Sequence, residues 1–139
     1  MSKRELEQIV ENGSVTDKTR LVDTLGALYL AQDRNSSARE RDLFFDIVRH
    51  VIHDVEMQVR GKLAAQLADK SDAPHDLIVM LANDVIEVAF PVLTNSPVLR
   101  DEDLVRLVLE KTTEYRGAIA GRAALHLSVS QTIVSTGDV

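Results

Sequence analysis

The 139-residue sequence contains no cysteine and no tryptophan. The absence of cysteine excludes disulfide bonds, thiolate metal sites and a thiol nucleophile, and it favours the cytoplasm as the compartment. Aromatic residues make up only 4% of the chain, although 45% of it is hydrophobic. Leucine, valine, isoleucine and alanine therefore supply most of the apolar surface, which favours helices packed on helices over a β-sandwich. We expect an all-α fold.

Long apolar runs are also absent. No segment approaches the roughly 18 to 20 apolar residues that cross a bilayer, and residues 1–8 are too polar for a signal peptide. We therefore expect a cytoplasmic protein with no membrane partner. The formal net charge is −6, from 16 basic and 22 acidic residues. Because binding phosphates requires a basic face, this charge makes nucleic acid a poor partner.

Apolar residues recur at spacings of three and four along most of the chain, which is the period of amphipathic helices. Ser14 and Asp17 form a variant capping box at the start of one such helix. The longest pattern runs from Leu43 to Leu67, and we expect it to break near His53 to Glu56. Further helices are predicted at residues 76–82, 85–93, 101–109, 115–124 and 129–135.

A weak internal repeat links these helices. Asp54-Val55 and Asp84-Val85 lie 30 residues apart, and Asp138-Val139 follows 54 residues later. Asp76-Leu77-Ile78 recurs as Asp103-Leu104-Val105 after 27 residues. A repeat of this length fits two short helices with their turns, and such units stack into a solenoid because none can bury its apolar face alone. We expect one helical domain over residues 1–139.

The segment from Asp54-Val55-Glu56 to Val59-Arg60 resembles the HEAT-repeat signature of an aspartate at the turn and Val-Arg early in the second helix. From about Arg20 onward the chain resembles a bacterial HEAT-like family, domain of unknown function 2336. Further motifs carry this resemblance: Ala73-Pro74-His75, Leu81-Ala82-x-Asp84, Ile86-Glu87-Val88-Ala89, Pro91-Val92-Leu93, Ser96-Pro97-Val98-Leu99, Asp101-Glu102-Asp103-Leu104 and Ile119-Ala120-Gly121-Arg122. The sequence departs from the family pattern at Arg100, where a capping serine is expected, and at Leu125-His126, where Leu-Ser is expected.

The resemblance implies an α-solenoid of HEAT-like helix pairs with an N-terminal helical cap, and no established activity. Members of the family tend to be longer, so we expect residues 1–139 to be the N-terminal part of a longer protein. Its last helix would then expose Ile133 and Val134.

An arginine ladder is also implied by the resemblance. In HEAT-like stacks the arginine of Val-Arg can reach the turn aspartate of an adjacent repeat. We predict that Arg60 pairs with Asp54 or Asp84 in this way, and a plain surface arginine is the alternative.

Few residues suggest chemistry. Four polar residues at helical spacing could in principle hold a divalent metal: Asp46, His50, His53 and Asp54. A solvated helix face is the more ordinary interpretation of this set. His75 and His126 stand near expected helix starts, where local capping or solvent exposure explains them without a ligand.

Gly117 and Gly121 form a Gly-x-x-x-Gly motif, which in a bilayer would indicate helix dimerisation. Arginines interrupt this segment, so we interpret the glycines as positions where neighbouring helices pack closely.

The function that we expect is a non-enzymatic scaffold or regulatory module that binds another protein through a helical-repeat surface. No phosphate loop, nucleophile elbow or zinc-protease motif is present, so we predict no catalytic residue and no cofactor. Two alternatives remain open. One is a nucleic-acid-binding HEAT-like protein, and the other is a metal-binding regulator or enzyme that uses the face of Asp46, His50, His53 and Asp54.

Overall fold

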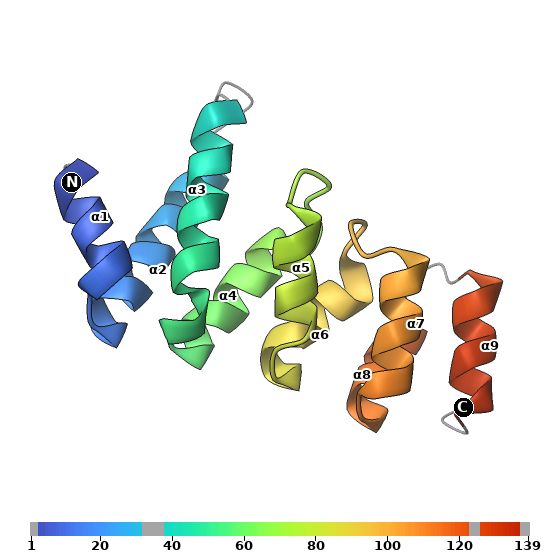
Figure 1. The fold of residues 1–139 in the computed structure, drawn as a ribbon. Coiled ribbons are helices and arrows are strands. Elements are labelled where there is room, and N and C mark those ends of the chain that lie inside the picture. The colour runs from blue at the N-terminus through green and yellow to red at the C-terminus, as the bar shows by residue number, and fades with distance from the viewer. Residues whose placement is uncertain (1–2, 32–37, 123–125, 137–139) are drawn as a thin grey trace. The chain divides into compact units, whose positions relative to one another are not determined.

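The computed structural model describes residues 3–31, 38–122 and 126–136, and every regular element in these ranges is a helix (Figure 1). The all-α prediction is therefore confirmed. The chain divides into two compact units, Met1–Leu63 (unit 1) and Ala64–Val139 (unit 2). The expected single domain over residues 1–139 stays a prediction, and the third Asp-Val pair, Asp138-Val139, lies outside the described residues.

Within the described ranges, no helix has both the length and the apolar character needed to span a bilayer.

Unit 1 is a cluster of helices around an aliphatic and aromatic core. Its elements are α1 (Lys3–Asn12), α2 (Val15–Ala31), α3 (Ala38–Val51), the 3₁₀ turn η1 (Ile52–Asp54) and the start of α4 (Met57–Leu67). Helices α1, α2 and α3 contact one another. Tyr29 of α2 stacks on Phe44 of α3, with 5.1 Å between the ring centroids. The core is formed mainly by Leu21, Val22, Phe44, Phe45, Ile47, Val48, Val51, Ile52, Val55 and Leu63.

Two local predictions are confirmed in this unit. The N–H of Asp17 donates to Ser14 Oγ (3.1 Å), and the N–H of Ser14 donates to Asp17 Oδ2 (3.4 Å), which completes the capping box. The long apolar pattern breaks where expected, because α3 ends at Val51 and α4 begins only at Met57. The N–H of Glu56, which no helix satisfies at this break, donates to the buried Thr19 hydroxyl of α2 at 3.0 Å.

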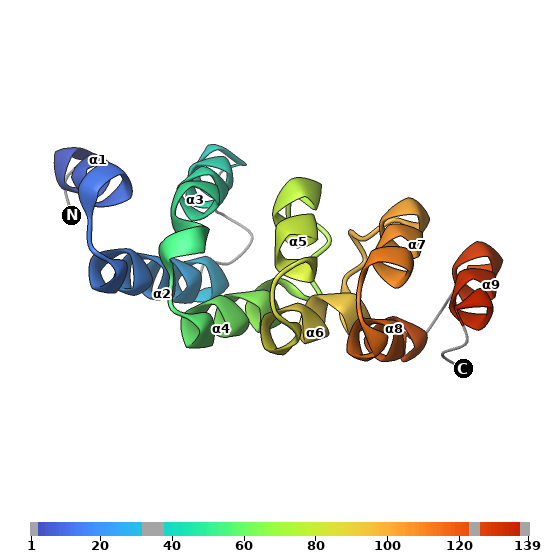
Figure 2. The same ribbon diagram turned by 60° about the horizontal axis from the view of Figure 1, so that its bottom comes forward.

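Unit 2 consists of short helices in two layers. Its helices are α5 (His75–Ala82), α6 (Ile86–Asn95), α7 (Asp101–Glu110), α8 (Thr113–Ala120) and α9 (Leu127–Ser135). Figure 2 shows α5, α7 and α9 side by side in one layer, with α6 and α8 in the other. The interlayer contacts run between α5 and α6, α7 and α8, and α8 and α9. Apolar side chains fill the space between the layers, chiefly Leu77, Ile78, Leu81, Val88, Val92, Leu93, Leu104, Leu107, Val108, Ile119, Val129 and Ile133.

The helices of unit 2 form close to their predicted bounds, but one expected exposed residue and one expected helix end are wrong. Ile133 is only 6% exposed, whereas Val134 is 60% exposed as predicted. One helical residue step turns the side chain by about 100°, so when Ile133 points inward, Val134 points outward. The helix predicted to end at residue 124 already ends at Ala120, and residues 123–124 lie outside the described part.

The glycine motif of α8 does not arise from close packing at Gly117. A Cβ atom at this position would meet no heavy atom within 4 Å. At Gly121 the nearest atom to such a Cβ is the carbonyl oxygen of Ala118, at 3.4 Å. That oxygen belongs to the preceding turn of the chain itself, so among the described residues no neighbouring helix packs closely against either glycine.

Candidate functional site

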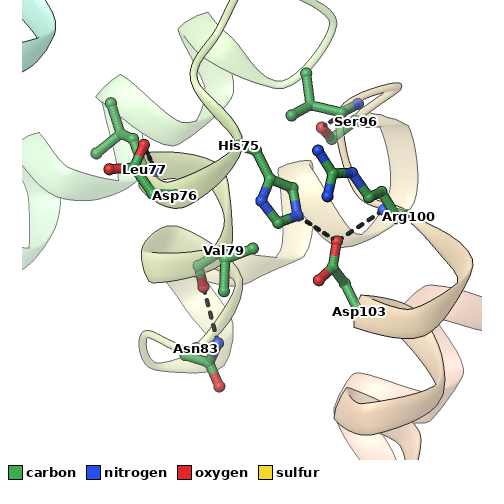
Figure 3. Close-up of polar contacts among 9 residues, drawn as sticks. His75, Asp76, Leu77, Val79, Asn83, Ser96, Arg100 and Asp103 are labelled. Atoms are coloured by element: carbon green, nitrogen blue, oxygen red, sulfur yellow. Dashed lines mark hydrogen bonds and ion pairs between the residues drawn. The ribbon is translucent and has the colours of Figure 1, made fainter.

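The N-terminus of α7 is held by a carboxylate. Arg100 is the N-cap residue, and its N–H donates to Asp103 Oδ2 at 2.8 Å. The Arg100 guanidinium cannot accept a hydrogen bond, so only this half of a capping box forms. The same oxygen of Asp103 lies 2.6 Å from His75 Nε2 at the start of α5 (Figure 3). His75 therefore has a partner 28 residues away, and local capping or solvent exposure alone does not explain it.

The charge of Asp103 is stabilised by these contacts. Partial burial opposes ionisation, but the N–H of Arg100, the hydrogen bond to His75 and the positive charges of these residues outweigh it. The pKa of Asp103 therefore lies below its ordinary value. The ionised carboxylate joins the starts of α5 and α7.

A second histidine caps α9. His126 is the N-cap residue, and its Nδ1 accepts a hydrogen bond from the N–H of Ser128 at 3.3 Å. The ring thus acts as a capping side chain usually does, which confirms the capping interpretation of His126. The same Nδ1 lies 3.8 Å from Asp101 Oδ2 in the first turn of α7. The starts of α7 and α9 are therefore neighbours.

A groove of about 640 Å³ lies between α7 and α9. From α7 it is lined by Asp101, Glu102, Val105, Arg106, Leu109 and Glu110. His126 and Ser128 line it from α9. Most of the lining surface is apolar, and Leu109 leaves 61% of its surface exposed. The groove thus combines an aliphatic floor with a rim that carries three carboxylates and one guanidinium.

The two glutamates of this rim differ from Asp101, which lies 3.8 Å from His126. Within the described residues, the side chains of Glu102 and Glu110 form no hydrogen bond and no ion pair. Both are exposed, as is Arg106 between them. Their charges are therefore available to a molecule in the groove.

Polar side chains from α8 and the turn after it form hydrogen bonds to main-chain carbonyls of α6, α7 and the turn before α6. The Tyr115 hydroxyl donates to the backbone carbonyl of Asp84 at 2.5 Å, and Arg116 Nε donates to the carbonyl of Val108 at 2.9 Å. Arg122 donates to the carbonyls of Leu93 (2.7 Å) and Ser96 (2.5 Å) at the end of α6. Each arginine places a positive charge at a helix C-terminus, where unpaired carbonyls gather.

These bracing residues were not predicted from the sequence. Arg122 directly follows a Gly that ends a helix, a position typical of a cation near a C-terminus. That signal does not reveal which helix receives the side chain, because Leu93 lies 29 residues earlier. Burial opposes the charged form of Arg122 and lowers the pKa of its guanidinium.

Residues of the polar face that was considered for metal binding have other partners within unit 1. Arg49 pairs with Asp46 at 2.7 Å, and His50 Nδ1 contacts the backbone oxygen of Asp46 at 2.7 Å. Lys18 pairs with Asp54 at 2.8 Å and, by hydrogen bond and charge, lowers the pKa of that carboxyl. Nowhere in the described ranges do three histidine, aspartate or glutamate side chains gather as a metal-binding group.

The predicted ladder residues occupy two units. Arg60 Nη1 donates to the carbonyl of Val55 at 2.7 Å, within the turn that also contains Asp54. Asp84 lies in unit 2, where its Oδ1 accepts from the N–H of Val85 at 2.7 Å. The pairing of Arg60 with Asp54 or Asp84 stays a prediction.

Comparison with known proteins supports the family resemblance over residues 88–139, which form the larger part of unit 2. Residues 88–139 match a family described as an uncharacterised protein conserved in bacteria, domain of unknown function 2336. The matched range includes α7, α9 and the groove between them. No curated protein and no solved structure matches the chain.

Proposed function

We propose that this protein is a non-enzymatic interaction module of the bacterial cytoplasm, built from HEAT-like helix pairs, which binds another protein in the groove between α7 and α9. The observation that carries the proposal is the groove itself. It has an apolar floor with an exposed leucine, Leu109, and charged groups at its rim. Protein interfaces commonly have this combination of an apolar centre and a polar rim.

The walls of the groove are suited to binding because they are braced. Arg116 holds the end of α7, and Asp103 holds its start. A surface that is already ordered loses less conformational entropy when a partner binds. The bracing of α7 therefore favours tight binding of a partner in this groove.

The alternatives have less support. Nucleic acid at this groove would meet the carboxylates of Asp101, Glu102 and Glu110, which repel phosphates. A metal-binding role for the face of Asp46 would require ligands that now pair with Arg49 and, at Asp54, with Lys18. The His75–Asp103 pair resembles part of a catalytic dyad, but its Asp103 oxygen also caps α7.

The test is affinity capture from a bacterial lysate with the longest available form of the protein. We expect Leu109→Asp to lose a partner that the wild type retains, because a charge in the apolar floor opposes burial there. Phe90→Asp is the matched control, since Phe90 is 53% exposed on α6 and does not line the groove. Equal capture by the wild type and both variants would place the binding surface elsewhere. If all captured proteins belonged to complexes with nucleic acid, the result would favour the nucleic-acid-binding alternative.

A further inference from the structure

From the charges of the groove we infer the chemistry of its occupant. This inference rests on the proposed function. We propose that the groove between α7 and α9 binds an amphipathic helix with two cationic side chains eight residues apart and aliphatic side chains between them. The partner is thus a basic segment of another protein.

The charge pattern of α7 determines the spacing. Glu102, Arg106 and Glu110 follow one another at intervals of four residues, and all three line the groove. At a rise of 1.5 Å per residue, the two glutamates are about 12 Å apart along the helix axis. Two lysines or arginines eight residues apart on a helix have the same axial separation. Such a partner would supply an ion-pair partner to both glutamates, which form no ion pair among the described residues.

The centre of the groove selects an aliphatic contact. Val105 and Leu109 lie between the two glutamates, and Leu109 is 61% exposed. Burying this side chain under a leucine of the partner removes apolar surface from water on both molecules. Arg106 disfavours a third cation near the middle of the partner, so the preferred segment has its positive charges at the two ends.

The walls of the groove favour a helical partner over an extended one. Both walls are helical: α7 forms one, and the start of α9 with its N-cap residue His126 forms the other. An extended peptide would find no strand edge to pair with, and its own N–H and C=O groups would lose water without a replacement. A helix satisfies those groups internally, as in other helix-in-groove complexes.

The experiment uses a synthetic peptide as the probe. The peptide has an alanine and glutamine background, two lysines eight residues apart, and leucines four and seven residues after the first lysine. Its binding to the whole ¹⁵N-labelled chain is followed by NMR, and we expect the largest shifts at Val105 and Leu109. Because the contacts are partly electrostatic, affinity should fall as salt rises.

Charge reversal is the decisive comparison. We expect the double variant Glu102→Lys/Glu110→Lys to bind the lysine peptide about tenfold or more weakly. The same variant should bind a peptide with glutamates in place of both lysines better than the wild type does. The double variant Glu87→Lys/Glu114→Lys is the control, because it changes the net charge equally at exposed positions outside the groove.

The outcomes separate this inference from the proposed function. If the lysine peptide does not bind, or if both double variants weaken it equally, the helical basic partner is wrong. The proposed function would still stand if Leu109→Asp abolished capture of a protein partner. If Leu109→Asp left that capture unchanged as well, both the partner chemistry and the groove as a docking surface would be overturned.

Discussion

His75 Nε2 and Asp103 Oδ2 lie 2.6 Å apart and join the first turns of α5 and α7. The Asp103 side chain is only 16% exposed, and the same oxygen also accepts the N–H of Arg100. One carboxylate thus caps its own helix and contacts a neighbouring one. Asp103 is therefore the residue at which helix capping and tertiary packing of unit 2 depend on the same charge.

We predict that Asp103→Asn lowers the free energy of unfolding by about 1 to 3 kcal/mol at neutral pH, because the partly buried His75 ring and the N–H of Arg100 both lose a charged acceptor. The folded pKa of Asp103 lies below its unfolded value. Its stabilising contribution is therefore complete above about pH 4 and declines as the pH falls through the lower folded pKa. Urea unfolding followed by circular dichroism at several pH values would measure this.

The control for this prediction is Asp101→Asn, whose side chain is 49% exposed and lies 3.8 Å from His126. We expect this variant to change stability by less than about 0.5 kcal/mol. The prediction would be contradicted if the free energy of unfolding fell equally with decreasing pH in the wild type and in Asp103→Asn.

Among the arginines of unit 2, Arg122 should contribute most to the stability of the fold. Arg122→Ala removes charged hydrogen bonds to the carbonyls of Leu93 and Ser96, and Ser96 is fully buried. We expect a loss of about 1.5 to 3 kcal/mol, the usual range for bonds to a charged group. Thermal melts can compare it with Arg106→Ala, which removes an exposed arginine and should cost under about 0.5 kcal/mol. Equal losses for the two variants would count against the bracing role.

Gly117 offers a stabilising substitution. It lies within α8, and an added Cβ would meet nothing within 4 Å. Gly117→Ala should raise the free energy of unfolding by about 0.5 to 1 kcal/mol, because alanine restricts the unfolded chain and favours helix. Gly13→Ala is the contrasting variant, since its Cβ would stand 2.6 Å from the backbone oxygen of Ile9. A melting temperature that falls for Gly117→Ala would show that close packing does operate at this position.

A double-mutant cycle would test the predicted pairing of Arg60 with Asp54. Arg60→Ala removes a hydrogen bond to the carbonyl of Val55, so it should lower stability by about 1 to 3 kcal/mol. If Arg60 also acts on Asp54, the double variant Arg60→Ala/Asp54→Asn should cost less than the sum of the two single variants. Strictly additive losses would show that Arg60 does not interact with Asp54, and the ion pair with Lys18 would then account for Asp54. The corresponding cycle of Lys18→Ala with Asp54→Asn serves as the positive control.

The all-α fold and most helix bounds follow from the sequence, because both depend on local signals. The three- and four-residue spacing of apolar side chains places α5, α6, α7 and α9, and the hydroxyl and carboxylate of Ser14 and Asp17 define the start of α2. The break after α3 was also predictable, although its partner, Thr19, was not. Local periodicity therefore determines which segments are helices.

The candidate site could not be predicted from the sequence, because it depends on which helix starts lie side by side in the folded chain. His75 and Asp103 are separated by 28 residues, and Asp101 and His126 by 25, with ordinary capping residues at each position. Nothing in either local sequence distinguishes a solvated histidine from one that meets a carboxylate of another helix. The groove likewise requires the distance between α7 and α9, which depends on the packing of these two helices on each other and on α8. The sequence alone determined the helices and their polar and apolar faces. Only the tertiary structure decided which charged side chains form contacts and which, such as Glu102 and Glu110, remain exposed to solvent. The reason is that these contacts depend on distances between segments far apart in the chain.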